Sequence, residues 1–161
     1  MKPTTIATLL ATAATAAAAA SPVVLPRASG PFQLSDISAQ VSTTTNTGSM
    51  YLIVVDTNEH DIATGCNVTW TPTPGLTPGT VVPCDYAAYA LSFPDGLYAD
   101  IADIYLVIET TAENILSESA NITLDAAASD SPWICGGVEE GVGETKCEYD
   151  GFVDVVVGSG V

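Results

Sequence analysis

Apolar and polar residues alternate with a period of two along several short segments, and this feature constrains the fold most. The clearest segment is 66–71, in which Cys66, Val68 and Trp70 alternate with polar residues. A period of two places successive side chains on opposite faces of a β-strand. The next segment, 72–79, contains three prolines and two glycines and must be a loop. The chain is rich in Thr, Val, Ile and Tyr, which favours many short strands over long helices.

The other expected strands are apolar or alternating segments of similar length, at 32–41, 50–55, 89–93, 104–108, 120–124 and 152–157. The phase of the first flips around Asp36, which predicts a β-bulge there. The continuous apolar run 50–55 predicts a strand covered on both faces, and 104–108 is a second apolar strand. Residues 56–61 are expected to form a polar turn. Seven or eight strands with short turns predict an all-β fold, a compact antiparallel β-barrel or sandwich.

The N-terminal region predicts a secreted protein. Residues 1–20 carry Lys2, an uncharged stretch rich in alanine, and small residues at Ala18 and Ala20, which is the pattern of a cleavable signal peptide. Residues 21–30 are expected to be a flexible leader, in which cleavage after Arg27 stays open. The remaining residues, 31–158, have the length of a single domain. The expected location of the mature protein is therefore extracellular.

Four cysteines in a secreted domain predict two disulfides. Three pairings are possible. The pairs Cys66–Cys84 and Cys135–Cys147 are favoured because each brackets one Pro- or Gly-rich loop. A zinc site is the rival interpretation, but it needs closely spaced ligands, and the sequence contains no C-x-x-C motif.

Two N-glycosylation sequons are present, Asn67-Val68-Thr69 and Asn121-Ile122-Thr123. Both asparagines fall on the polar faces of expected strands, so Asn67 and Asn121 are the predicted glycosylation sites. A crosslink at the neighbouring Cys66 could hinder transfer to Asn67.

The charge distribution excludes some classes of partner. The formal net charge is −16, and Arg27 and Lys146 are the only basic residues after Ala20. Such a surface repels phosphate backbones and anionic headgroups, so neither nucleic acid nor membrane is an expected partner. Solubility outside the cell is a sufficient explanation of the acidity. Steering toward a basic protein is the sharper alternative.

No catalytic, metal or cofactor site is predicted. Glu118 shares the phase of Ala120 and Ile122, which would bury it as a candidate acid–base group. A strand that begins after Ser119 would instead leave Glu118 in a turn, and this alternative is preferred.

The single histidine, His60, is expected to be solvated in its polar turn. A solvated charge run is also preferred over a calcium site for the acidic segment, since it lacks the spaced D-x-D-x-D-G pattern. That segment carries Glu139, Glu140, Glu144, Glu148 and Asp150.

The order of these motifs resembles a known family. The strand Cys66-Asn67-Val68-Thr69-Trp70 leads through a Pro-rich loop to Pro83-Cys84, and Cys135-Gly136-Gly137 and Cys147 precede the terminal strand 152–157. Over residues 31–158 the chain is similar to the Alternaria major allergen family, secreted proteins found only in fungi. The resemblance implies a compact β-barrel, the disulfide pairs favoured above and no enzymatic activity.

The same resemblance sets the expectations about function. Members are described as allergens, elicitors or effectors that engage plant defence proteins, and some as binders of small aromatic ligands. The chain is therefore expected to bind a host extracellular protein, a basic one if charge steering operates. The alternative is an extracellular carrier of a small apolar or aromatic ligand, which a core without a cavity would contradict. The resemblance implies that a covalent dimer would form through a cysteine near the mature N-terminus. None lies between Ser21 and Gly65, so a disulfide-linked dimer is not expected and a non-covalent homodimer stays open.

Overall fold

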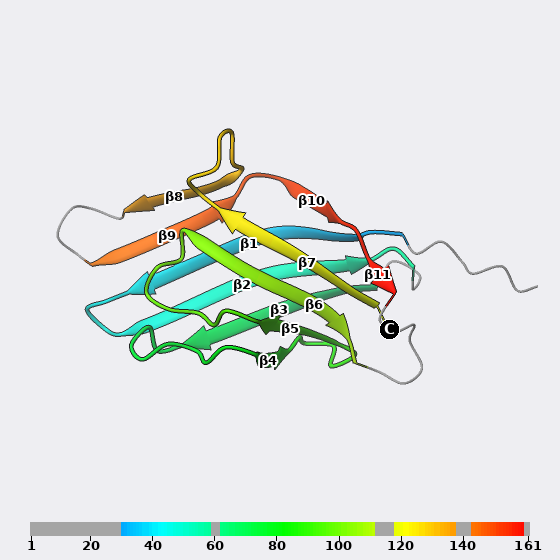
Figure 1. The fold of residues 1–161 in the computed structure, drawn as a ribbon, viewed down its shortest axis with the longest axis horizontal. Coiled ribbons are helices and arrows are strands. Elements are labelled where there is room, and N and C mark those ends of the chain that lie inside the picture. The colour runs from blue at the N-terminus through cyan, green and yellow to red at the C-terminus, as the bar shows by residue number, and fades with distance from the viewer. Residues whose placement is uncertain (1–29, 59–61, 112–117, 138–142, 160–161) are drawn as a thin grey trace, which may run out of the picture.

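The computed structural model describes residues 30–58, 62–111, 118–137 and 143–159, and these form only β-strands and connecting turns (Figure 1). The first five strands are β1 (Phe32–Ser42), β2 (Thr47–Asp56), β3 (Ile62–Trp70), β4 (Thr80–Pro83) and β5 (Tyr89–Phe93). The remaining strands are β6 (Asp103–Thr110), β7 (Glu118–Asp125), β8 (Trp133–Gly137), β9 (Glu144–Tyr149), β10 (Phe152–Val155) and β11 (Gly158–Ser159). The expected all-β class is confirmed.

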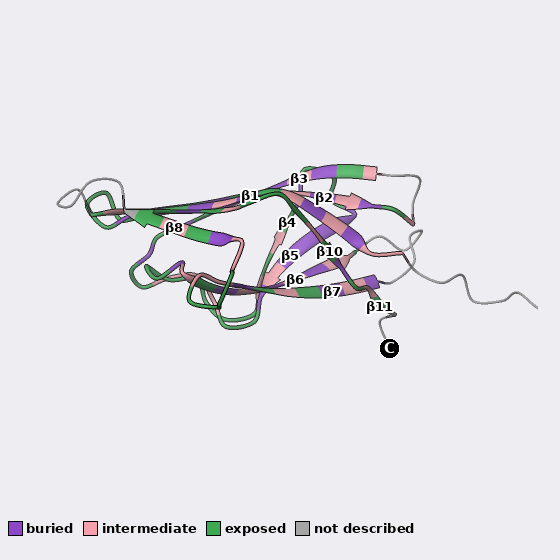
Figure 2. Ribbon diagram, turned by 90° about the horizontal axis from the view of Figure 1, so that it is seen from above, coloured by how far each residue is buried: buried purple, intermediate pink, exposed green. Residues whose placement is uncertain are grey.

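The strands form two antiparallel sheets that face each other (Figure 2). The six-stranded sheet has the order β3-β2-β1-β9-β8, and β10 also pairs with β1. The five-stranded sheet has the order β11-β7-β6-β5-β4. Of the two expected arrangements, the described strands therefore form the sandwich. No described helix is long and apolar enough to cross a membrane.

The bulge predicted at Asp36 is confirmed. The register of β1 against β2 shifts between Ser35 and Ser38, and Asp36 has a φ of 51°. Aspartate is one of the few residues that tolerates this left-handed conformation. Because of the extra residue, Leu34 and Ile37 both point into the core, which explains the flip in phase. The bulge also marks a change of neighbour, since β10 pairs with β1 before it and β9 pairs with β1 after it.

The continuous apolar run 50–55 is covered on one face only, so the expectation of burial on both faces is wrong. In β2, Met50, Leu52 and Val54 are buried, whereas Tyr51 is 39% exposed. In β6 the residues between the buried ones are half-buried in the same way. In a two-layered sandwich each sheet has one partner layer, so its outer face meets solvent. The Ile, Val and Tyr residues on that face satisfy strand propensity without full burial.

The core fills the space between the sheets. Five large residues of β5 and β6 lie at its centre and are 2% exposed or less, namely Tyr89, Leu91, Phe93, Ile104 and Leu106. Two buried tryptophans of the six-stranded sheet also reach the segment between β5 and β6. Trp70 Nε1 donates to the carbonyl of Tyr98 at 3.1 Å, and Trp133 Nε1 donates to that of Ile101 at 3.0 Å. These bonds satisfy the indole donors and tie the sheets together.

The structure contains the two disulfides that the spacing favoured. Cys66 on β3 is bonded to Cys84 directly after β4, so this bond crosslinks the two sheets, and we call it the inter-sheet disulfide. Cys135 and Cys147 lie directly opposite each other on β8 and β9, so their bond joins neighbouring strands of one sheet. The proposed signal peptide, the leader before Gly30, His60, Glu139 and Glu140 lie outside the described residues.

Candidate functional site

The outer face of the six-stranded sheet carries a row of side chains that runs across five strands. In order from β8 to β3, the row consists of Ile134, Glu148, Ser38, Tyr51 and Asn67. Each residue lies directly opposite the next in the pairing of the strands, so their side chains project from the same face. Four of the five are exposed, and Ser38 is half-buried.

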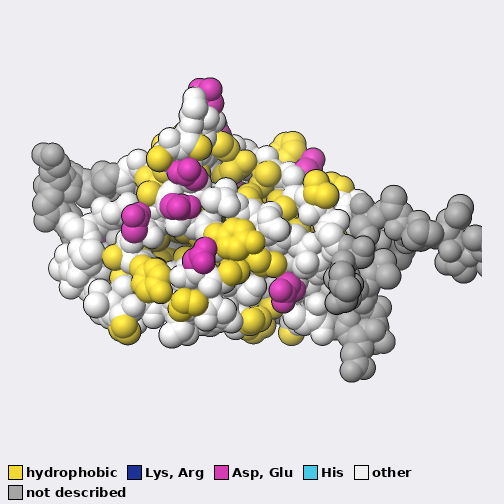
Figure 3. Space-filling model, in the orientation of Figure 1, with side chains coloured by type: hydrophobic (Ala, Val, Ile, Leu, Met, Phe, Trp, Pro, Cys, Tyr) yellow, Lys and Arg dark blue, Asp and Glu magenta, His cyan; other side chains and the backbone are white. Residues whose placement is uncertain are grey.

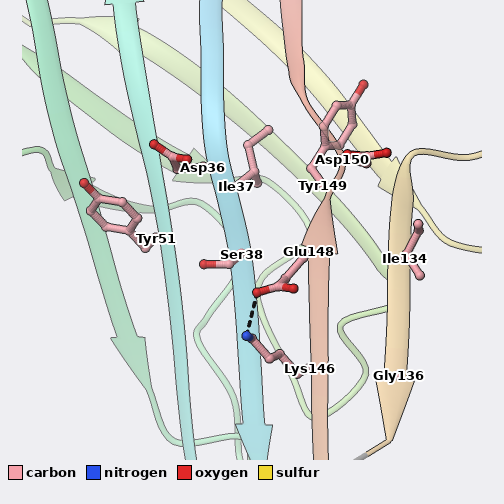
Figure 4. Close-up of a pocket in the computed structure, with 10 residues that line it drawn as sticks. All are labelled: Asp36, Ile37, Ser38, Tyr51, Ile134, Gly136, Lys146, Glu148, Tyr149 and Asp150. Carbon is pink, nitrogen blue, oxygen red and sulfur yellow. Dashed lines mark ion pairs between the residues drawn. The ribbon is translucent and has the colours of Figure 1, made fainter.

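The small side chain of Ser38 leaves a groove in the middle of this row. The groove has a volume of about 740 Å³, with Tyr51 on one side and Ile134 on the other (Figure 4). Its upper end lies at the bulge in β1, where Asp36 lies on the β2 side of the strand and Ile37, Tyr149 and Asp150 lie on the β9 side. We call this cavity the β1–β9 groove.

The charges of the β1–β9 groove are mainly negative. Asp36, Glu148 and Asp150 line it and are exposed. Lys146 is the only lysine or arginine in the part of the chain that the structure describes, and its Nζ lies 2.5 Å from Glu148 Oε1. Exposed ion pairs of this kind add little to stability. The groove therefore presents three carboxylates against one ammonium group that already has a carboxylate partner.

The hollow continues along the same outer face. A second cavity of about 390 Å³ shares Ser38, Tyr51 and Lys146 with the β1–β9 groove and reaches Asn67 and Thr69 on β3. A third, of about 710 Å³, shares Thr69 and its neighbours on β1 and β2 and extends to the loop after β3. The outer face of the six-stranded sheet is thus hollowed over much of its length.

The outer face of the five-stranded sheet differs in its charges. Figure 3 shows acidic and hydrophobic side chains on this side of the molecule and no lysine or arginine. No basic side chain is expected on this face, because Lys146 lies on β9 of the other sheet. The acidic character predicted from composition is therefore present on both faces, but the grooves described above all lie on the six-stranded sheet.

Glu118 is buried, and the expected turn at this position is wrong. It is the first residue of β7 and is 3% exposed. The strand begins earlier than expected because Glu118 pairs with Ser159 of β11, while its backbone N–H donates to Thr110 Oγ1 at 2.8 Å. Asn58 Nδ2 donates to Glu118 Oε2 at 3.2 Å.

A second carboxylate is buried in the same network. Asp56 ends β2 and is 0% exposed, although the sequence placed it in a polar turn. Its Oδ2 accepts a hydrogen bond from the Tyr89 hydroxyl at 2.7 Å, and its Oδ1 accepts one from the Asn58 backbone at 2.8 Å. The Asn58 side chain also exchanges two hydrogen bonds with the Gly30 backbone. The network fastens the start of the domain to the end of β2.

This buried network and the three cavities described above share no residues: Asp56, Asn58, Tyr89 and Glu118 line none of them. Their hydrogen bonds satisfy buried polar groups, as a folded interior requires. We therefore assign the network a structural role.

The remaining predicted site residues are dispersed. Asn67 on β3 and Asn121 on β7 are both exposed, and their glycosylation stays a prediction. Within the acidic segment, Glu148 and Asp150 are exposed and Glu144 is half-buried. Among the described residues, no three His, Cys, Asp or Glu side chains are grouped to hold a metal ion.

The chain matches no protein-family model and no curated protein. It is similar to two crystal structures of the Alternaria alternata major allergen Alt a 1. One is 14% identical, with a TM-score of 0.54 over 80% of this chain and 92% of the allergen. The other is 16% identical, with a TM-score of 0.57 over 87% and 96% of the two chains. Likeness at these identities establishes a shared fold, and it confirms at that level the family resemblance drawn from the motifs.

Proposed function

We propose that this chain is a secreted, non-enzymatic protein of the allergen type, and that it binds a basic extracellular protein of a plant host through the β1–β9 groove. One observation carries the proposal. The groove exposes the carboxylates of Asp36, Glu148 and Asp150, and its one ammonium group, on Lys146, is already paired with Glu148. The shared fold with Alt a 1 and the two disulfides support an extracellular protein of this type.

The composition of the groove suits a protein partner. Exposed carboxylates attract lysine and arginine side chains and speed the encounter with a basic surface. Tyr51 and Ile134 are 39% and 61% exposed, and they offer apolar contacts on either side of the charged strip. An aromatic residue beside complementary charge is typical of the energetically important part of a protein interface.

The test compares two variants that carry the same change in charge. The groove variant combines Asp36→Asn, Glu148→Gln and Asp150→Asn. Because Asp36→Asn creates the glycosylation sequon N-I-S at positions 36–38, wild type and both variants are produced in a host that does not N-glycosylate. The control variant combines Asp95→Asn, Asp103→Asn and Asp130→Asn, which are exposed carboxylates outside all three cavities. Asparagine tolerates the left-handed backbone at Asp36 and Asp130, so neither variant should strain the chain.

Each immobilised protein is exposed to plant apoplastic proteins, and the retained proteins are identified by mass spectrometry. Wild type and the control variant should retain the same basic proteins, and the groove variant should lose them. Equal retention by both variants would remove the groove from the proposal. If unglycosylated wild type retains nothing above background, the proposed host binding is wrong.

A small aromatic ligand is the second candidate, and the size of the groove favours it. A volume of about 740 Å³ lies within the range of small-molecule pockets, and Tyr51 offers a ring for stacking. The filled core contradicts a carrier that holds its ligand between the sheets, so this candidate concerns the outer groove alone. Fluorescence titration with a neutral naphthylamine dye tests whether such a ligand binds in the groove. Loss of dye binding in Tyr51→Ala would support a ligand site in the β1–β9 groove. Dye binding that this substitution leaves unchanged would contradict it.

A further inference from the structure

The two glycosylation sequons lie on opposite faces of the sandwich. Asn67 and Thr69 are exposed on β3, which is an edge strand of the six-stranded sheet. Asn121 and Thr123 are exposed on β7 of the five-stranded sheet. The folded domain can therefore carry a glycan at either asparagine without losing buried contacts. Only the first of these positions is on the face that contains the β1–β9 groove.

Asn67 is close to the residues that form the groove. It lies directly opposite Tyr51 in the pairing of β2 and β3, and it lines the 390 Å³ cavity together with Tyr51 and Lys146. Neighbouring strands are about 4.8 Å apart, so β3 and β9 are separated by about 14 Å across the sheet. A branched glycan of several sugars on Asn67 spans that distance and has hollowed surface to lie in.

We propose that N-glycosylation of Asn67 covers the β1–β9 groove and so regulates docking there, whereas a glycan on Asn121 leaves the groove open. The regulatory part rests on the function proposed above.

The sugar donor for this modification is a polyprenyl diphosphate-linked oligosaccharide. A bond forms between Asn67 Nδ2 and the anomeric carbon of the first sugar, while the bond from that carbon to the diphosphate oxygen breaks. The diphosphate leaves, and the amide nitrogen gives up one proton.

The structure supplies a reporter of groove access that needs no partner. Lys146 lines the groove, its side chain is 46% exposed, and Lys2 of the predicted signal peptide is the only other lysine. A bulky amine-reactive biotin ester therefore labels Lys146 and the α-amino group, which peptide mapping separates. The Lys146–Glu148 ion pair is present in all forms of the protein. A difference in the labelling rate of Lys146 between forms therefore reports how far the glycan covers the groove.

The experiment uses the full chain secreted by a glycosylating eukaryotic host, as wild type, Asn67→Gln and Asn121→Gln. Intact mass before and after treatment with a peptide N-glycosidase gives the occupancy of each site. Wild type and Asn121→Gln should label severalfold more slowly at Lys146 than Asn67→Gln does. Enzymatic removal of the glycan should abolish the difference.

Two results would overturn the inference: an unmodified Asn67 in the secreted protein, or labelling of Lys146 that is the same with and without the glycan. Retention of basic plant proteins by the glycosylated and deglycosylated forms then separates this inference from the proposed function. If deglycosylation exposes Lys146 but the protein still retains no partner, the glycan covers the groove and the proposed host binding fails.

Discussion

Replacing Tyr89 by phenylalanine removes one hydroxyl group from the interior and preserves the rest of the ring. In the folded protein that hydroxyl donates to Asp56 Oδ2 at 2.7 Å, and both residues are 0% exposed. The ring itself makes an edge-on contact with Phe32, with ring centroids 6.3 Å apart, which Tyr89→Phe keeps. The substitution therefore tests a single buried hydrogen bond to a carboxyl group.

The expected cost follows from the burial of both partners. Removing one partner of a buried hydrogen bond costs about 1–3 kcal/mol, because water cannot replace a donor that is lost in the interior. We expect Tyr89→Phe to lower the free energy of unfolding by about 2–3 kcal/mol, which is a large part of the roughly 5–15 kcal/mol typical of a domain. The matched control is Tyr98→Phe, since Tyr98 is 45% exposed. Its effect should stay within about 0.5 kcal/mol.

Equilibrium unfolding in urea, followed by tryptophan fluorescence and far-UV circular dichroism, measures the difference. The midpoint should fall for Tyr89→Phe while the dependence on urea concentration stays the same. In an Asp56→Asn background the same substitution should cost less, because its acceptor is changed. A Tyr89→Phe variant that is as stable as the Tyr98→Phe control would refute the reasoning, since the hydroxyl would then make no contact that matters to folding.

Three further predictions concern the backbone and the crosslinks. Gly48→Ala should cost about 1–3 kcal/mol by urea unfolding, because the added methyl group overlaps the ring of Trp70, the residue opposite it on β3; wild-type stability would show that the ring moves freely. Asp36→Ala should cost about 1–2 kcal/mol and Asp36→Asn much less, because of the left-handed backbone at the bulge; equal losses would assign the cost to the lost carboxylate. Replacing both cysteines of the inter-sheet disulfide by serine should lower the free energy of unfolding by about 3 kcal/mol, because the disulfide closes a loop with a sequence separation of 18. An unchanged urea midpoint would contradict this.

The strand pattern could be predicted from the sequence because alternation is a local property. The bulge at Asp36 was visible as a change of phase, and the structure places it there. The continuous apolar run of β2 was misread because its sequence cannot tell how many layers cover a sheet. Val55 is half-buried on the outer face, while Val54 beside it is buried.

The site depended on information that the local sequence lacks. Ser38, Tyr51 and Glu148 meet in one groove only because the pairings of β1 with β2 and with β9 set their registers. Glu118 was misplaced for a similar reason, since its strand is extended by pairing with the distant β11. Asp56 did carry a local signal. It continues the buried alternation of Met50, Leu52 and Val54, but its charge suggested a turn.

Binding of a basic protein by the β1–β9 groove is tested most directly by the salt dependence of the association rate. A retained basic plant protein is passed over wild type, the groove variant and the control variant at two salt concentrations in a surface plasmon resonance instrument. Halving the salt should speed association with wild type and with the control variant, because screening of exposed charges weakens at lower ionic strength. The groove variant should respond much less. A wild-type rate that does not change with salt, or an equal response of both variants, would contradict the account.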